Sequence, residues 1–211
     1  MSGRIAPVVL HLDGLCLRYA QRVIFEQLSA KIHPGVTFVQ GGDGRGKTTL
    51  LRVLAGEQRG QTGSLKVNGI SLGDQPQAYR GQVFWADPSA TEWEQTTALD
   101  YFKSLVPRYA QWDELLLGEL VAGLSLAQHI EKPMYMLSTG SKRKVWLAAA
   151  FASGAAVTLL DEPFAALDKT SIGFVLELLQ DAANHTTRAW VVADYEAPAQ
   201  VPLVAVIALG D

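Results

Sequence analysis

The segment from Gly41 to Thr49, GGDGRGKTT, has the residue types and spacing of a phosphate-binding loop. It fits the pattern G-x-x-x-x-G-K-[S/T] at every fixed position. In such a loop the backbone N–H groups point at phosphate, the lysine reaches the outer phosphates and the hydroxyl binds Mg²⁺. The simpler alternative is a glycine-rich turn before an ordinary helix. The residues predicted to contact nucleotide are Gly41, Gly42, Asp43, Gly44, Arg45, Gly46, Lys47, Thr48 and Thr49, with Thr48 also a metal ligand.

A second, acidic segment could complete the same site. Residues 157–160 are apolar and are followed by Asp161 and Glu162. A buried strand that ends in Asp is how a phosphate-loop enzyme holds Mg²⁺, directly or through water. Glu162 can polarise the attacking water as a general base, so Glu162 and Lys47 are the predicted catalytic residues. The alternative is a strand followed by an acidic surface turn.

Strands and helices that alternate along the chain predict an α/β fold around these residues. A strand at 36–39 leads into the loop, and a helix with a stop at Gly56 follows it. Further strands are expected at 82–85, 156–160, 190–193 and 203–208, with helices at 141–152 and 168–182. This alternation predicts the core of a P-loop NTPase, a mainly parallel sheet with flanking helices on both faces.

Two smaller parts are expected beside this core. Apolar runs at 8–10, 15–17 and 23–25 predict an N-terminal antiparallel β subdomain, with a turn at Asp13-Gly14, and residues 64–67 are expected to form another short strand. Residues from about 87 to 136 are expected to form a short inserted helical subdomain. Its helices begin near Thr97, which opens a capping box, and Asp113. Residues 1–211 are therefore interpreted as a single nucleotide-binding domain.

Composition limits the functions that this chain can have. It has 211 residues and a net charge of −3, which argues against a nucleic-acid-binding surface. Its longest apolar run, residues 145–160, is too short to span a bilayer, and its first residues lack the apolar core of a signal peptide. We therefore expect a cytoplasmic protein that reaches a membrane only through a partner.

The order of the motifs resembles that of the ATP-binding-cassette (ABC) ATPases. The phosphate loop is followed by Leu137-Ser138-Thr139-Gly140-Ser141 before a helix, then by LLDEP at 159–163, then by Ala166-Leu167-Asp168. The resemblance covers essentially the whole chain. The short helical lobe and the wording PFAALD look most like the small cassettes of haem-exporter systems.

This resemblance implies ATP and Mg²⁺ as ligands, a transmembrane permease subunit as one partner and a second cassette as the other. In the family two cassettes pair head to tail, so Ser138 and Gly140 would contact ATP held by the neighbour, and Asp168 would lie in the loop that crosses between them. The structural alternative for Asp168, compatible with this role, is a cap on the next helix. An anion site made of a hydroxyl, bare backbone and a helix N-terminus is physically reasonable. Tyr19 stands where the family stacks an aromatic ring on adenine; the alternative for it is a tyrosine at a strand end.

The chain departs from the family pattern at three places. Thr139 and Ser141 replace residues of the usual Gly-Gly-Gln. Asp87 stands where the family has a glutamine that touches Mg²⁺, and as a carboxylate it could still be a ligand. Asp194 stands where the family has a histidine on the γ-phosphate, and an ionised Asp accepts hydrogen bonds and repels phosphate. The histidines of the chain (11, 33, 129, 185) lie elsewhere in the sequence.

These observations lead to one main hypothesis and three alternatives. The main hypothesis is a transporter subunit in which ATP binding closes a cassette dimer and hydrolysis, slowed by Asp194, reopens it. The alternatives are a non-transport ABC ATPase that acts on nucleic acid or ribosomes, a catalytically degenerate regulatory subunit, and a small-molecule kinase. Long coiled-coil insertions and tandem cassettes are absent from the sequence, and a kinase would not carry LSTGS before LLDEP. A transporter subunit is therefore favoured.

Overall fold

The structure, a computed structural model, describes residues 7–20, 22–87 and 89–210, and it confirms the α/β prediction. Within these residues the central sheet is parallel and has the strand order β6-β7-β8-β3-β9. The strand that leads into the phosphate loop is thus separated from the strand that ends in Asp161 by β8. The strands are β6 (Val83–Trp85), β7 (Val157–Asp161), β8 (Ala189–Ala193), β3 (Gly35–Gln40) and β9 (Leu203–Ala208).

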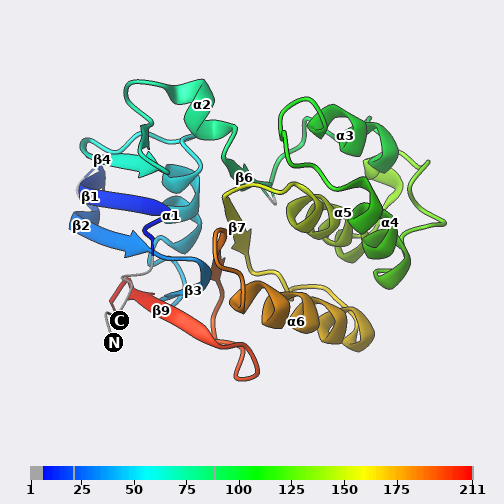
Figure 1. The fold of residues 1–211 in the computed structure, drawn as a ribbon. Coiled ribbons are helices and arrows are strands. Elements are labelled where there is room, and N and C mark those ends of the chain that lie inside the picture. The colour runs from blue at the N-terminus through cyan, green and yellow to red at the C-terminus, as the bar shows by residue number, and fades with distance from the viewer. Residues whose placement is uncertain (1–6, 21, 88, 211) are drawn as a thin grey trace, which may run out of the picture.

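Helices and a second sheet cover the two faces of the central sheet. Because side chains alternate along a strand, Val191 faces one layer and its neighbours Trp190 and Val192 face the other. The first layer contains α1 (Lys47–Leu54) and the antiparallel sheet; the second contains α5 (Thr139–Ala152) and α6 (Lys169–Ala183). Figure 1 shows β6 and β7 between these two parts of the molecule. Both faces are buried, as the continuous apolar strands predicted.

The antiparallel sheet corrects one prediction. It has the order β2-β1-β4-β5 within the described residues. Asp13 and Gly14 do not form a turn; they lie inside β1, where the register shifts between Leu12 and Leu15 and Gly14 has φ 58°. Because β1 pairs with β2 on one side and β4 on the other, the local irregularity becomes a bulge. The strands are β1 (Leu10–Tyr19), β2 (Arg22–Ile32), β4 (Thr62–Val67) and β5 (Ile70–Ser71).

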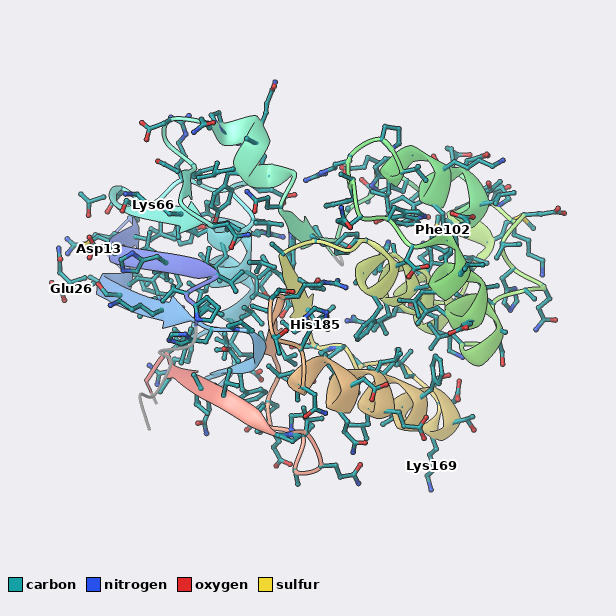
Figure 2. All side chains as sticks on the ribbon, viewed as in Figure 1. Asp13, Glu26, Lys66, Phe102, Lys169 and His185 are labelled. Atoms are coloured by element: carbon teal, nitrogen blue, oxygen red, sulfur yellow. The ribbon has the colours of Figure 1, made fainter. Side chains whose placement is uncertain are left out.

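Helices between β6 and α5 form the expected helical part of the chain. Thr97 caps α3 (Ala98–Leu105) by accepting from the backbone N–H of Asp100, and Asp113 caps α4 (Glu114–Gly123) in the same way through Leu116. The aromatic side chains of α3, including Phe102 in Figure 2, are buried against α5 and its neighbours. The sequence did not predict β5, α2 (Pro76–Arg80) or the short 3₁₀ helix η1 (Met134–Met136).

Within the described residues, no helix has the length and apolar character needed to cross a membrane.

Candidate functional site

The predicted site residues follow the carboxyl ends of neighbouring parallel strands. The phosphate loop follows β3, Glu162 follows β7, Asp194 follows β8, and Asp87 lies just beyond β6. Ala193 pairs with Val39 on one side and with Asp161 on the other, so these strands end at the same level. In open parallel sheets this edge is where ligands bind. Segments that are more than a hundred residues apart in sequence therefore meet at one edge of the sheet.

The phosphate loop has the backbone that its glycines predict. Gly46 has φ 95°, and a Cβ on it would lie 2.7 Å from Ile24 Cγ2, so a larger residue would be strained and would also clash. Residues 42–45 are exposed, whereas Lys47 is only 7% exposed. Its Nζ donates to the carbonyls of Gly41 (2.8 Å) and Gly42 (3.2 Å). The ammonium is thus held at the mouth of the loop, where it can meet a phosphate.

The hydroxyl and the carboxylate predicted to hold a metal are in direct contact. Thr48 Oγ1 donates to Asp161 Oδ2 at 2.6 Å. The other carboxylate oxygen, Asp161 Oδ1, is buried and has no hydrogen-bond partner among the described residues. Burial raises the pKa of Asp161, opposed by the bond from Thr48, and the charge of Glu162 raises it further. The charges of Arg143 and Lys47 oppose this rise. A hydroxyl and one carboxylate are a small set of oxygen ligands of the kind that Mg²⁺ takes when phosphates and water complete its shell.

Glu162 and Asp194 follow neighbouring strands, β7 and β8. The backbone N–H of Glu162 donates to the Ala193 carbonyl at 2.7 Å, and Glu162 has φ 45°, a left-handed conformation that is rare for this residue type. Burial raises the pKa of Asp194, and the negative charge of Glu162 raises it further, while Lys47 opposes the shift. The sequence predicts an acidic group at Asp194 where the family has a hydrogen-bond donor. In the structure the carboxyl group of Glu162 lies close enough to act on it.

Asp87, a predicted metal ligand, accepts hydrogen bonds that the sequence did not predict. Its Oδ2 accepts from Arg52 Nε (3.1 Å) and Nη2 (2.8 Å), and its Oδ1 accepts from the backbone and hydroxyl of Ser89. Although burial opposes it, these bonds and the guanidinium charge lower the pKa of Asp87. Asp87 shares a cavity of about 200 Å³ with Thr48 and Asp161, but among the described residues its hydrogen bonds are to Arg52 and Ser89. Within the described residues its carboxylate is occupied by Arg52 and Ser89.

Ser138, Gly140 and Asp168 lie around the start of α5. Ser138 caps this helix by accepting from the Ser141 N–H at 3.1 Å. A Cβ on Gly140 would lie 2.4 Å from the carbonyl oxygen of Ala166 in the same chain. A larger residue at this position would therefore clash within a single subunit. Asp168 caps α6 and pairs with Lys144 of α5 at 2.7 Å; the hydrogen bond from Lys144 and those from Ser171 hold its pKa well below its ordinary value.

Tyr19 stands at the end of β1, opposite Arg22 of β2. Its ring is 49% exposed, and its hydroxyl accepts a hydrogen bond from Gln58. Arg22 reaches the phosphate loop itself, because its Nη2 donates to the Gly44 carbonyl at 2.6 Å. The hairpin end is therefore anchored to the loop, with an exposed aromatic ring beside the anchor, and the predicted contact of Tyr19 with adenine stays a prediction.

Sequence reasoning missed three arginines that shape the site: Arg22, Arg52 and Arg143. Arg52 follows Thr48 by four residues on a helix, a spacing that puts both on one face and could have been noticed. Arg22 and Arg143 reach the site from other elements, so no local pattern marks them. His185 does not replace the missing donor, because it precedes β8 whereas Asp194 follows it. The five residues of β8 span about 17 Å, so the two side chains belong to opposite ends of the strand.

Comparisons with known proteins show the family to which the chain belongs. The sequence model of the family described as "ABC transporter" matches residues 25–165. The cytochrome c biogenesis ATP-binding export protein CcmA of Rhodospirillum rubrum is 31% identical over 204 residues, which cover 93% of this chain and 83% of that protein. The protein of the same name from Pseudomonas savastanoi is 30% identical over 188 residues, which cover 89% and 87%.

Solved structures support the fold. An ATP-binding subunit of an ABC transporter superposes with a TM-score of 0.79 at 22% identity and covers 89% of this chain and 79% of its own. A putative ABC transporter ATP-binding protein from Pyrococcus furiosus gives a TM-score of 0.75 at 21% identity, with coverage of 95% and 96%. At these identities the likeness concerns the fold alone.

Proposed function

Because this chain belongs to the ABC transporter family, as its ATP-binding subunit, we propose that it binds Mg·ATP, hydrolyses it slowly and drives a membrane partner by nucleotide-dependent pairing of two cassettes. The observation that carries the proposal is the bond between Thr48 and Asp161, with Lys47 beside it on the loop. Lys47 and Thr48 begin helix α1 and Asp161 ends strand β7, and together they would form a phosphate and metal site.

The binding half of the site supports tight retention of nucleotide. The loop from Gly41 to Gly46 would surround the phosphates with backbone N–H groups, and Lys47 would place its ammonium on the outer phosphates. Thr48 and Asp161 would hold Mg²⁺, which supplies charge neutralisation of the phosphates when bound. Asp87 would join them only by leaving Arg52 and Ser89, so we place it beside the metal site as a secondary ligand candidate.

The chemical half of the site supports slow turnover. Glu162 is the proposed general base for the attacking water. Asp194 stands where a donor to the γ-phosphate is expected, and its carboxyl lies in the field of Glu162. When ionised it can donate no hydrogen bond and repels the charge that develops in the transition state. We therefore propose that binding is retained while the rate of hydrolysis is reduced.

The same arrangement supports a role that depends on pairing. ATP held on the loop of one copy would be covered by Ser138 and Gly140 of a second cassette, with Asp168 near the crossing, so that nucleotide joins the subunits. A permease subunit would place the pair at the cytoplasmic face of a membrane. The CcmA relatives are export proteins by name, which agrees with a transport role. A subunit that binds ATP without turnover and only regulates its partner is the second candidate, favoured by the adjacent acids Glu162 and Asp194.

The pairing step is tested by the association state of a hydrolysis-deficient variant. Glu162→Gln is incubated with Mg·ATP, alone and with the protein's natural cassette and permease companions, and its mass is measured by sedimentation velocity. The proposal predicts a shift to a cassette dimer that requires Mg·ATP, and no shift for the Lys47→Ala, Glu162→Gln double variant. A protein that stays monomeric in every mixture at high concentration would contradict nucleotide-dependent pairing.

A further inference from the structure

Arg143 connects helix α5 to the turn that carries the proposed general base. Its Nη1 donates to the backbone carbonyl of Asp161 at 2.8 Å and to that of Glu162 at 2.7 Å. One nitrogen thus bridges the last residue of β7 and the residue after it. α5 lies beside β7 in the fold, so the side chain spans the short gap between helix and strand (Figure 1).

The turn at Glu162 needs an external constraint. A non-glycine residue with φ 45° is in a sparsely populated conformation that costs about 1–3 kcal/mol and persists only where its surroundings fix it. Two contacts fix this one: the Glu162 N–H donates to Ala193, and the Glu162 carbonyl accepts from Arg143. The first comes from the sheet itself. The second comes from a helix outside the sheet.

Arg143 also brings a positive charge to a group of acids. It lines the same cavity as Thr48, Asp161 and Glu162. A charged donor makes stronger hydrogen bonds to carbonyls than a neutral one does, by roughly a factor of two. These bonds are therefore strong enough to hold the backbone of Glu162 in place while its carboxylate stays available for other contacts.

We propose that Arg143 is a positioning residue: it fixes the backbone of Glu162, so that the position of helix α5 determines where the general base points. The inference rests on the proposed hydrolytic function. It extends that function because α5 begins at Ser138 and Gly140, the residues proposed to meet the nucleotide of a second cassette. A shift of α5 on pairing then reaches Glu162 of the same chain directly through the guanidinium.

The test compares Arg143→Met with Lys142→Met in the full chain. Both replace a long cation of α5 by an unbranched apolar side chain, but Lys142 pairs with Glu94 and not with the turn at Glu162. We expect the kcat of Arg143→Met to fall about 10–100-fold relative to Lys142→Met, because misplacement of a catalytic group by about 1 Å costs rates of this order. The dissociation constant of Mg·ATP is expected to change less than about twofold, since the loop and Lys47 are unaltered.

Two further measurements separate positioning from loss of structure. Arg143→Lys keeps one charged donor and is expected to recover part of the lost kcat. In the Glu162→Gln background, Arg143→Met is expected to leave the single-turnover rate unchanged, because a residue that acts through Glu162 has nothing left to position. Equal kcat for the two Met variants, weaker ATP binding with unchanged kcat, or an undiminished rate loss in the Glu162→Gln background would overturn the inference. If Glu162→Gln itself turns over like the wild type, the proposed role of Glu162 fails instead.

Discussion

The two halves of the site differ in the groups that donate hydrogen bonds to their acids. On the metal side, Thr48 is bonded to Asp161 at 2.6 Å and Lys47 is fixed by two carbonyls. On the side proposed to face the γ-phosphate, Asp194 accepts only from the backbone N–H of Tyr195 among the described residues, and burial and the charge of Glu162 raise its pKa, as they raise that of Asp161. Asp87, the other acid at a departure from the family pattern, is balanced by Arg52. This difference is the basis of our proposal that Mg·ATP binding is retained while hydrolysis is slow.

Among the variants that test this comparison, Lys47→Ala is expected to have the largest effect, a loss of affinity for Mg·ATP. Removing the ammonium takes away a charged hydrogen bond to phosphate, which is worth about 1.5–3 kcal/mol. We expect the affinity for Mg·ATP to fall about 10–150-fold, measured by equilibrium binding of a fluorescent ATP analogue. Lys142→Ala, which removes a cation bound to Glu94, serves as the control and should bind normally. Undiminished binding by Lys47→Ala would show that the loop does not hold the phosphates.

A smaller effect, on stability, is expected when the cation paired with Asp87 is removed. Arg52→Met leaves Asp87 without its guanidinium and should lower the free energy of unfolding by about 1–2 kcal/mol, because the pair is only partly exposed. The Arg52→Met, Asp87→Asn double variant should lose less than the sum of the single variants, which urea denaturation of all four proteins measures. Additive losses would mean that Asp87 is not stabilised by Arg52.

The smallest effect on stability is expected for Asp194→Asn, and this effect depends on pH. The raised pKa means that the folded state holds this proton more tightly than the unfolded state does. The wild type should therefore lose stability relative to Asp194→Asn as pH rises from the unfolded pKa near 3.9 through the raised folded pKa. The difference in unfolding free energy should stay below about 1 kcal/mol, since the group is screened by solvent. A gap that widens as pH falls would have the wrong sign.

The sequence predicted the parts of the site that depend on local pattern. The strand, loop and helix around Lys47 and the strand that ends in Asp161 lie where their spacing placed them. The sequence could not predict which charged side chains come together from distant segments. Asp87 pairs with Arg52, which is 35 residues away, and Arg143 of α5 donates to the backbone of β7. The turn predicted at Asp13-Gly14 was wrong because pairing on both sides keeps β1 continuous. Local propensity gives the elements, whereas the packing of the elements decides which charges meet.

The most direct test of the central claim is the steady-state ATPase rate of the wild type, Glu162→Gln and Asp194→His under identical conditions. The account predicts a slow wild type, a still slower Glu162→Gln and a faster Asp194→His. The expected gain in Asp194→His is about 10–100-fold, because a donor replaces a carboxylate at the γ-phosphate and one such donor is worth up to about 10²–10³ in kcat. A wild type that turns over briskly, together with an Asp194→His variant that is slower, would contradict it.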